Sequence, residues 1–415
     1  MDAETIVSDR VDAPDPEHIL GRGVAEIEAV QAVVERLLPP PLRSIVDTQF
    51  SVSHLLFDEY VLRLAIQIMQ DVKLDAAIGT WASAAEAATR AGLDPRASQV
   101  PVDWLLRHLA ARGAVTSERH DREPRFLLER VLPALAPAAV VEAQRAHDAA
   151  CLPAYTIAET AARDYPAFLR GERSGDEILL APMRLPLWVA YFSNDNPLYR
   201  VNNRIGAAAL EAWLPRGANT ILELGGGLGS GASAVLEKLT AAGRLGDVKA
   251  YRFTELVPAF LRRAERWIKE RFANAAPLSF ASLDMNRPFV EQGVAPASVS
   301  QVYAVNTLHV AHDLAFTLGE IRQALVPGGQ LVVSECIRPS VGQTLYPEFV
   351  FNLMSTFRAP RLDPDLRPNG GFLTPEQWTR AFSAAGFADV RVMPDIARIR
   401  EVFPSFYAAA IAGTR

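Results

Sequence analysis

The 415-residue sequence has few cysteines, no excess of positive charge and no long apolar run. Its two cysteines, Cys151 and Cys336, are too few for a disulfide framework, and no stretch approaches the roughly 18 consecutive apolar residues of a membrane span. The net charge of −6 gives no general attraction for nucleic acid or anionic lipid. The acidic N-terminus does not resemble a secretion signal. We therefore expect a cytoplasmic protein with no membrane span and no nucleic-acid partner.

The composition is that of a globular protein, with 49% hydrophobic and 22% charged residues. At roughly 150 residues per domain, the length suggests two or three domains. Residues 1–22 are acidic and poor in apolar side chains, which predicts a solvated tail. The remaining chain divides by its pattern into residues 23–130, 131–204 and 205–415.

Residues 23–130 predict a mostly helical domain. The apolar spacing indicates helices over about 23–38 and 57–73, and two more over 82–91 and 101–112 that end at glycines. Residues 114–128, AVTSERHDREPRFLL, have the pattern of a β-hairpin. Two helices followed by a hairpin predict a winged-helix domain.

Residues 205–415 alternate apolar strands with amphipathic helices, which predicts an α/β fold with a doubly wound, mainly parallel, Rossmann-like sheet. Residues 131–204 mix alanine-rich runs with prolines and aromatics, and we expect a helical connector that helps to enclose a substrate. The last two of the seven expected strands have no helix between them, so they should form an antiparallel hairpin. The expected strands are 220–224, 250–254, 278–282, 299–305, 330–334, 390–393 and 406–411.

The most informative stretch is residues 219–239, NTILELGGGLGSGASAVLEKL. An apolar strand runs into a loop that contains Gly225, Gly227 and Gly229, and a helix follows. Glycines let the chain turn sharply and bring backbone amides close to a ligand at a helix N-terminus. The loop therefore predicts a nucleotide-like cofactor site, the alternative being a tight strand-to-helix turn. No Walker lysine follows, which excludes a P-loop.

Three carboxylates narrow the choice of cofactor. Glu223 precedes the first glycine, where it would meet a cationic group, and Glu255 ends the next strand, where it can chelate two ribose hydroxyls. Asp284 follows the third strand and can accept from an adenine amino group. Together they suit S-adenosylmethionine, a cation without phosphate. Taken singly, Glu255 could be a solvated strand end, and Asp284 could cap the chain before Asn286.

Residues 219–415 resemble class I S-adenosylmethionine-dependent methyltransferases, and more narrowly the C-methyltransferase domains of polyketide synthases. The resemblance rests on features typical of those domains: an acidic residue after the third strand, a Gln-Gly, an Asn-x-x-His after the fourth strand, and a Gly-Gly before a fifth strand that ends in glutamate. They occur in SLDMNRPFVEQGVAPASVSQVYAVNTLHVAHDLAFTLGEIRQALVPGGQLVVSECIRP, and LRPNGGFLTPEQWTRAFSAAGFADV follows.

The N-terminal half resembles instead the winged-helix dimerisation domain of stand-alone small-molecule O-methyltransferases. This resemblance implies a homodimer. It departs from the polyketide pattern, so the acceptor could be a free small molecule or one tethered to a carrier protein.

His309 and Glu335 are the predicted catalytic pair. They follow the fourth strand and end the fifth, and ligands of open α/β sheets bind beyond the carboxyl ends of strands. The resemblance implies that they form an acid/base dyad. An imidazole with a pKa near ~6.5 can take a proton from a carbon between two carbonyls, or from a hydroxyl, while the carboxylate fixes its tautomer.

Other interpretations of these residues stay open. His309 could be a structural histidine at a helix start, or could form a metal site with His312, Asp313 and Glu335. Asp313 is expected to cap the helix over 314–325.

Further residues are assigned to the cofactor by the resemblance. Asn306 belongs to the Asn-x-x-His motif. Tyr199, with Asn202 and Asn203, precedes the cofactor domain, where related enzymes close over the methionine end of the cofactor. The alternative for the latter three is a polar linker.

We expect a methyltransferase that uses S-adenosylmethionine to modify a small, polyketide-like natural-product intermediate. C-methylation is the first choice, and O-methylation of a hydroxyl or carboxyl is the alternative. A winged-helix DNA-binding regulator is a minor alternative, because residues 1–130 contain 14 Lys and Arg against 21 Asp and Glu, a net charge of −7, whereas a groove-reading helix needs basic residues. A catalytically inactive partner is the last alternative.

Overall fold

The computed structural model describes residues 28–120, 123–272 and 277–415, so the predicted acidic tail lies outside the described residues. The chain forms two compact units, each assembled from separate stretches of sequence. The described part of the first unit comprises Glu28, Thr48–Tyr191 and Gly342–Arg358, and the second comprises Ala29–Asp47, Phe192–Val341 and Ala359–Arg415. The division expected at residue 204 falls inside helix α10 (Pro197–Trp213) of the second unit.

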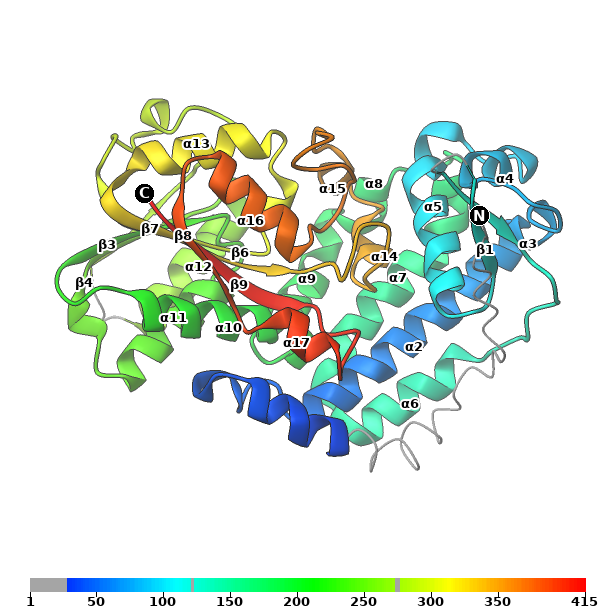
Figure 1. Cartoon of the computed structure of the whole chain (residues 1–415), viewed down its shortest axis with the longest axis horizontal. Helices are drawn as coiled ribbons and strands as arrows, with labels where there is room; N and C mark the ends of the chain where they lie inside the picture. The colour runs from blue at the N-terminus through cyan, green and yellow to red at the C-terminus, as the bar shows by residue number, and fades with distance from the viewer. Residues whose placement is uncertain (1–27, 121–122, 273–276) are drawn as a thin grey trace, which may run out of the picture. The chain divides into compact units, whose positions relative to one another are not determined.

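The first unit is mostly helical, and its longest helix, α2 (Thr48–Asp71), is buried along much of its length (Figure 1). A β-hairpin, β1 (Thr116–His120) and β2 (Glu123–Leu127), pairs Thr116 with Leu127. The elements of the winged-helix pattern thus occur in the expected order, and the winged-helix assignment itself stays a prediction. The other elements are α3 (Leu74–Ala77), α4 (Ala84–Arg90), α5 (Pro95–Ala111), α6 (Pro137–Asp148), η2 (Ala149–Cys151), α7 (Leu152–Leu169), α8 (Gly175–Leu179), η3 (Pro182–Arg184), α9 (Leu185–Tyr191), α14 (Glu348–Phe351) and α15 (Ser355–Arg358).

Helix α5 begins six residues earlier than the sequence pattern predicted. The side chain of Asp94 accepts hydrogen bonds from the backbone of Arg96 and Ala97, and Pro95 occupies the first helical position. An acidic N-cap followed by proline is a helix start in its own right. Pro101, the predicted start, lies inside the helix.

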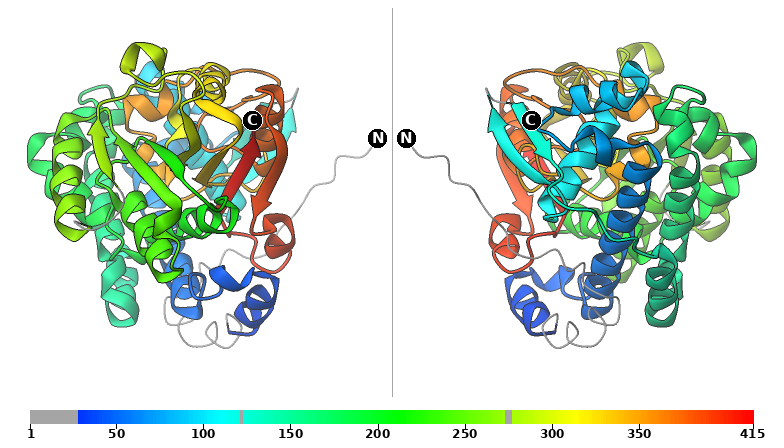
Figure 2. Two further views of the ribbon diagram at one scale, coloured as in Figure 1. Left: turned by 90° about the vertical axis from the view of Figure 1, so that its left-hand side faces the viewer. Right: turned by 90° about the vertical axis from the view of Figure 1, so that its right-hand side faces the viewer.

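The second unit is an α/β fold built on a seven-stranded sheet (Figures 1 and 2). The strand order is β5-β4-β3-β6-β7-β9-β8, in which β9 runs antiparallel to both neighbours and the other paired strands are parallel. The seven expected strands are confirmed with small shifts of their ends. They are β3 (Asn219–Leu224), β4 (Val248–Thr254), β5 (Leu278–Ala281), β6 (Val299–Val305), β7 (Leu325–Cys336), β8 (Ala388–Met393) and β9 (Ala408–Thr414).

Helices lie on both faces of this sheet. Helix α10 packs against α11 (Ser230–Ala241) and against β7 and β9, while α13 (Leu314–Ala324) and α16 (Pro375–Ala384) contact each other. The central strands β3 and β6 are buried along most of their length, as expected of strands that are covered on both faces. The remaining elements are a helical stretch over residues 28–37, η1 (Pro40–Leu42), η4 (Leu245–Asp247), α12 (Pro258–Arg271), η5 (Val290–Gln292), η6 (Leu308–Val310) and α17 (Ile396–Arg400).

The last two strands pair antiparallel as the sequence predicted, but they are not joined as a simple hairpin. Helix α17 lies between them, and β9 is inserted between β7 and β8. The segment Ala408–Ala412 is apolar and buried along its whole length, so a position inside the sheet suits it better than an edge.

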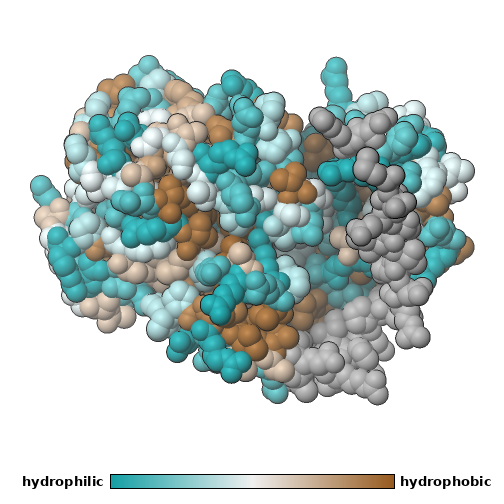
Figure 3. Space-filling view, in the orientation of Figure 1, coloured by the Kyte–Doolittle hydropathy of each residue, from teal (hydrophilic) through white to brown (hydrophobic). Residues whose placement is uncertain are grey.

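The described helices include none that is both long and apolar enough to cross a membrane. Figure 3 shows that hydrophilic and hydrophobic side chains are interspersed on one face of the molecule.

Candidate functional site

The glycine loop follows β3 and leads into α11. Gly225, Gly227 and Gly229 have φ angles of +56°, +59° and +92°, a region that favours glycine. A Cβ at Gly225 would lie 2.4 Å from Cγ2 of Thr307. At Gly227, by contrast, a Cβ would meet no atom of the described residues within 4 Å. The loop thus packs tightly at its start and is open at Gly227.

Glu223 lies within β3, and its carboxyl is buried beneath this loop. Its Oε2 accepts a hydrogen bond of 2.9 Å from the Tyr251 hydroxyl, and the backbone amide of Ala232 in α11 also donates to it. Burial raises the pKa of Glu223 to about 8. These contacts tie β3 to β4 and α11, and the predicted contact with a cationic ligand group stays a prediction.

Glu255 directly follows β4 and lies against the glycine loop. Its Oε2 accepts from the backbone amide of Gly227 at 2.8 Å, and its Oε1 accepts from that of Val257 at 2.7 Å. The carboxyl is buried, which raises its pKa, and so it is no solvated strand end. Each oxygen has a second lone pair, so ribose chelation fits these contacts.

His309 and Glu335 form a buried hydrogen-bonded pair. Glu335 lies near the end of β7 and His309 in η6, which follows the adjacent strand β6. Nδ1 of His309 lies 2.7 Å from Oε2 of Glu335, and Oε1 accepts from the backbone amides of Thr307 and Leu308 at 3.1 and 2.9 Å. With its Nδ1 proton directed to Glu335, the imidazole carries its lone pair on Nε2, where it can act as a base.

Thr307 connects this pair to the glycine loop. Its backbone amide donates to Glu335, and its hydroxyl donates to the carbonyl of Gly225 at 3.1 Å. The sequence carries no signal for this residue, because its role depends on a loop residue 82 positions earlier in the chain. The carboxyl ends of β3, β4, β6 and β7 therefore bring together the loop, Glu255, His309 and Glu335.

Asn306 has a φ of +47° and joins helix α10 to the ends of β6 and β7. Its Oδ1 accepts from Nδ2 of Asn202 at 2.9 Å and from the backbone amide of Cys336 at 3.0 Å. These bonds position Asn306 beside the catalytic candidates, and its contact with a cofactor stays a prediction.

Tyr199, Asn202 and Asn203 belong to α10 and are not a polar linker. Nδ2 of Asn203 donates to Asn194, which in turn donates to the carbonyl of Ser230 at the start of α11. The pKa of Tyr199 is raised by burial, and also by the neighbouring Cys336 and the carboxyls of Glu223, Glu335 and Glu255. Tyr199 thus lies near the predicted site residues.

Asp284 has no described contact with the other site residues. It lies three residues beyond β5, and its Oδ1 accepts from the backbone amide of Asn286 at 2.9 Å and from that residue's side chain. This is the capping contact considered as an alternative, and a role with adenine stays a prediction.

The four residues of the alternative metal site do not form one ligand set. Asp313 caps α13 through the amide of Phe316, as expected, and pairs with Arg361 at 3.1 Å. Nδ1 of His312 contacts the carbonyl of Ala359. Within the described ranges, no three His, Cys, Asp or Glu side chains are placed to hold a metal ion.

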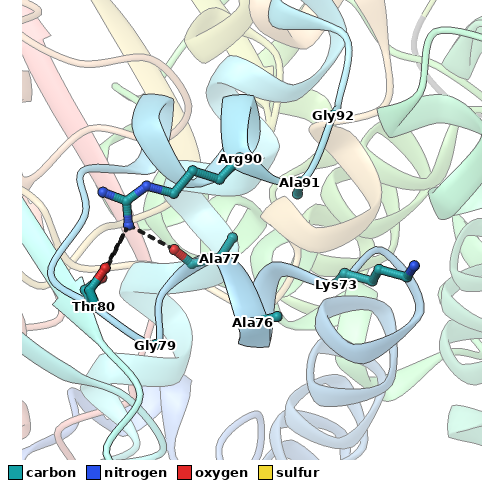
Figure 4. A pocket seen from close by; sticks show the side chains of 8 residues that line it. All are labelled: Lys73, Ala76, Ala77, Gly79, Thr80, Arg90, Ala91 and Gly92. Atoms are coloured by element: carbon teal, nitrogen blue, oxygen red, sulfur yellow. Dashed lines mark hydrogen bonds between the residues drawn. The ribbon is translucent and has the colours of Figure 1, made fainter.

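A surface pocket of about 560 Å³ lies in the first unit. Figure 4 shows its arginine, Arg90, donating to the carbonyl of Ala77 and to Thr80. The guanidinium thus holds the surrounding loop, and none of the predicted site residues lines this pocket.

No family model matches the chain. In sequence it is 28% identical to polyketide synthase PksR of Bacillus subtilis over 58% of the chain and 9% of that protein. It is 30% identical to methyltransferase calH of Penicillium decumbens over 48% of the chain and 49% of that protein. The chain thus spans less than two thirds of the length of either relative.

Several solved structures resemble almost the whole chain. The CurJ carbon methyltransferase has a TM-score of 0.71 at 20% identity, over 98% of this chain and 99% of that one. The trans-methyltransferase CalH, solved in complex with SAH, has a TM-score of 0.58 at 22% identity, over 89% and 92%. The N-terminal half, expected to depart from the carbon methyltransferases, is therefore included in the match. The chain has the fold of carbon methyltransferases.

Proposed function

We propose that this chain is an S-adenosylmethionine-dependent methyltransferase that methylates a carbon of a polyketide-like intermediate, with His309 and Glu335 as its acid/base pair. The observation that carries the proposal is the 2.7 Å contact between Nδ1 of His309 and Oε2 of Glu335 at the ends of neighbouring strands. The same strand ends meet the glycine loop through Thr307. A base and a cofactor loop in one place are what methyl transfer requires.

The chemistry of the pair follows from its hydrogen bonds. Nε2 of His309 removes a proton from the acceptor carbon, and the imidazolium that forms is stabilised by Glu335. Glu335 is fixed by the amides of Thr307 and Leu308, so the imidazole keeps one tautomer and one orientation. When bound, S-adenosylmethionine would supply an electrophilic methyl group, with its sulfonium sulfur as the leaving group that keeps the electron pair of the S–CH3 bond.

The residues around the glycine loop fit this cofactor. The open side of Gly227 leaves room for a ligand, and the Glu255 carboxylate beside it has lone pairs for ribose hydroxyls. The loop carries no cationic side chain for a phosphate, in keeping with a phosphate-free cofactor. The structural neighbour CalH, solved with SAH, supports the same assignment.

Carbon methylation is favoured over oxygen methylation by the fold. The O-methyl alternative depended on the N-terminal half, and that half is included in the match to the CurJ carbon methyltransferase. The sequence relatives include a polyketide synthase, which supports a polyketide-like acceptor. A homodimer and a carrier protein stay predictions from sequence, as does the free or tethered state of the acceptor.

The decisive experiment supplies the purified chain with S-adenosylmethionine carrying an isotopically labelled methyl group and with β-ketothioester acceptors. We expect mass spectrometry and NMR to place the label on the carbon between the carbonyls. His309→Ala should reduce turnover by about 10²-fold or more, the usual contribution of general acid/base catalysis, with cofactor affinity retained.

The matched control is His312→Ala, three residues away, where the exposed side chain contacts the backbone carbonyl of Ala359. It should leave turnover within about twofold of the wild type, because surface substitutions have small effects. A label on oxygen would show that the chain methylates oxygen and not carbon. Full activity in His309→Ala would refute the assigned base.

A further inference from the structure

A buried arginine beside His309 has no role in the proposed chemistry so far. Arg367 lies in the second unit and is 2% exposed. A tight turn directs it inward: the backbones of Asp363 and Arg367 exchange hydrogen bonds of 2.9 and 2.8 Å, and the Asp363 side chain accepts from the amides of Asp365 and Leu366. This turn places a guanidinium in the interior of the unit.

The Arg367 side chain contacts the residue that carries the proposed base. Its Nη2 donates to the carbonyl of His309 at 2.5 Å and to that of Gly371 at 3.1 Å. The next residue, Phe372, has its ring centroid 4.6 Å from the imidazole of His309. The segment from Arg367 to Phe372 therefore holds His309 from both its backbone and its ring.

Two nitrogens of the same guanidinium have no hydrogen-bond partner in the described part of the chain. Nε and Nη1 are buried, and no acceptor among the described residues reaches either of them. No carboxylate of the described chain forms an ion pair with Arg367, and both of its acceptors are neutral carbonyls. Glu335 acts on it only through a longer-range electrostatic interaction.

Burying a cation without a counter-charge is unfavourable unless a partner neutralises its charge and accepts its hydrogen bonds. Burial lowers the pKa of Arg367 to about 10, which still leaves it charged at neutral pH. Buried N–H donors are almost always satisfied in native proteins. An oxygen acceptor that carries negative charge would satisfy both the free donors and the charge.

We propose that Arg367 binds the carbonyl oxygen on which negative charge collects when His309 deprotonates the acceptor carbon. This inference rests on the proposed function. The C–H bond breaks, its proton goes to Nε2 of His309, and the electron pair moves onto the oxygen bound by Arg367. The pair returns to carbon when the methyl group is transferred.

The test separates enolate binding from methyl transfer. The probe is acetylacetone, a small 1,3-dicarbonyl whose enolate absorbs in the ultraviolet, titrated at one mildly alkaline pH without cofactor. The wild-type chain should bind the enolate, and Arg367→Gln should bind it at least about tenfold more weakly, because hydrogen bonds to a charged group are lost. Arg367→Lys keeps the charge and should recover part of the affinity.

The matched control is Arg400→Gln. Arg400 belongs to the same unit, and all three of its guanidinium nitrogens donate to backbone carbonyls, those of Phe406, Arg338 and Ile337. This variant should bind the enolate like the wild type. Retained S-adenosylmethionine affinity, measured by calorimetry, shows that the Arg367 variants are folded.

The outcomes distinguish a failure of the role of Arg367 from a failure of the proposed function. Equal enolate binding by the wild type and Arg367→Gln, or none by the wild type, overturns the role of Arg367. With cofactor and a β-ketothioester, Arg367→Gln should lower kcat by roughly 10²-fold and leave the KM for S-adenosylmethionine unchanged. A wild-type chain that binds the enolate but not S-adenosylmethionine overturns the proposed function instead.

Discussion

Glu335 is a carboxylate with no solvent exposure that accepts three hydrogen bonds, from two backbone amides and an imidazole. A buried carboxylate is costly unless such donors surround it. The two amides belong to Thr307 and Leu308, the residues just before His309. The segment after β6 therefore positions both the imidazole and the carboxylate of Glu335. The pair is thus preorganised by local backbone, which lowers the reorganisation needed during proton transfer.

The raised pKa of Glu223 predicts that the stability of the folded chain depends on pH. Its pKa is raised from 4.5 to about 8 in the folded chain, so the folded state keeps a proton that the unfolded state releases. Its contribution to stability is therefore full below the unfolded pKa and is lost as the pH rises toward 8. Relative to Glu223→Gln, the wild type should lose up to about 1.4 kcal/mol of unfolding free energy per pH unit in this window.

Urea denaturation of both proteins over a pH series measures this difference. The same substitution at exposed Glu291 serves as the control and should give a difference that does not change with pH. A flat difference for Glu223→Gln as well would mean that Glu223 titrates normally in the folded chain.

At the scale of elements, the loop between β3 and α11 is tightly packed in one part and open in another. Gly226 leaves no room for a side chain, since a Cβ there would lie 2.2 Å from Cε2 of Phe253, while Gly227 faces open space. Its tight start fixes the loop against β4 and Thr307, and its open part exposes backbone to a ligand. The helix that follows directs its N-terminal amides to the same place.

The open part of the loop can be tested by substitution. Gly227→Asp should weaken S-adenosylmethionine binding by about tenfold or more, because its side chain fills the space assigned to the cofactor and filling a packed site costs about 1–3 kcal/mol. Gly243→Asp is the matched control: Gly243 has a similar φ of +63°, also faces open space among the described residues, and follows the end of α11.

Isothermal calorimetry measures the affinity of the two variants for S-adenosylmethionine. Because the two glycines have similar φ angles, both substitutions strain the backbone to a similar degree. The Gly243 variant should bind like the wild type. Equal affinity in all three proteins would show that the cofactor does not lie at Gly227.

At the scale of the whole molecule, the chain passes repeatedly between its two units. Residues 342–358 follow β7 in sequence yet belong to the first unit. There Nε1 of Trp104 donates to Oε2 of Glu348 at 3.0 Å, and the amide of Leu345 donates to the same oxygen at 2.9 Å. Glu348 is buried, so these donors hold the insertion against helix α5.

Trp104→Phe should loosen this insertion. The phenyl ring retains an aromatic surface for His108, which stacks on Trp104 at 4.6 Å, but the hydrogen bond to Glu348 is lost. We expect a loss of about 1–3 kcal/mol in unfolding free energy and faster amide hydrogen exchange in residues 342–358. The half-exposed Trp267 offers the control substitution, Trp267→Phe, and should change neither. Unchanged exchange in the Trp104 variant would mean that other contacts hold the segment.

Much of the second unit and part of its site could be predicted from sequence, because the signals are local. Alternating apolar runs predicted all seven strands, and Asp313 was recognised as a helix cap from its position alone. Strand ends in a parallel sheet meet at one edge, so His309 and Glu335 could be paired without coordinates. The start of α5 differs from the prediction because two competing start signals lie close together, and the capping pair Asp94 and Pro95 begins the helix while Pro101 lies inside it.

The sequence by itself determined the strands, the glycine loop and the order of the carboxylates along the chain, since each depends on a few neighbouring residues. Only the tertiary structure decided that Thr307 joins the loop to Glu335, that Arg367 lies against His309, and that residues 342–358 pack with the first unit. These contacts join residues tens to hundreds of positions apart. No local pattern encodes them, because they form only when separate elements pack together.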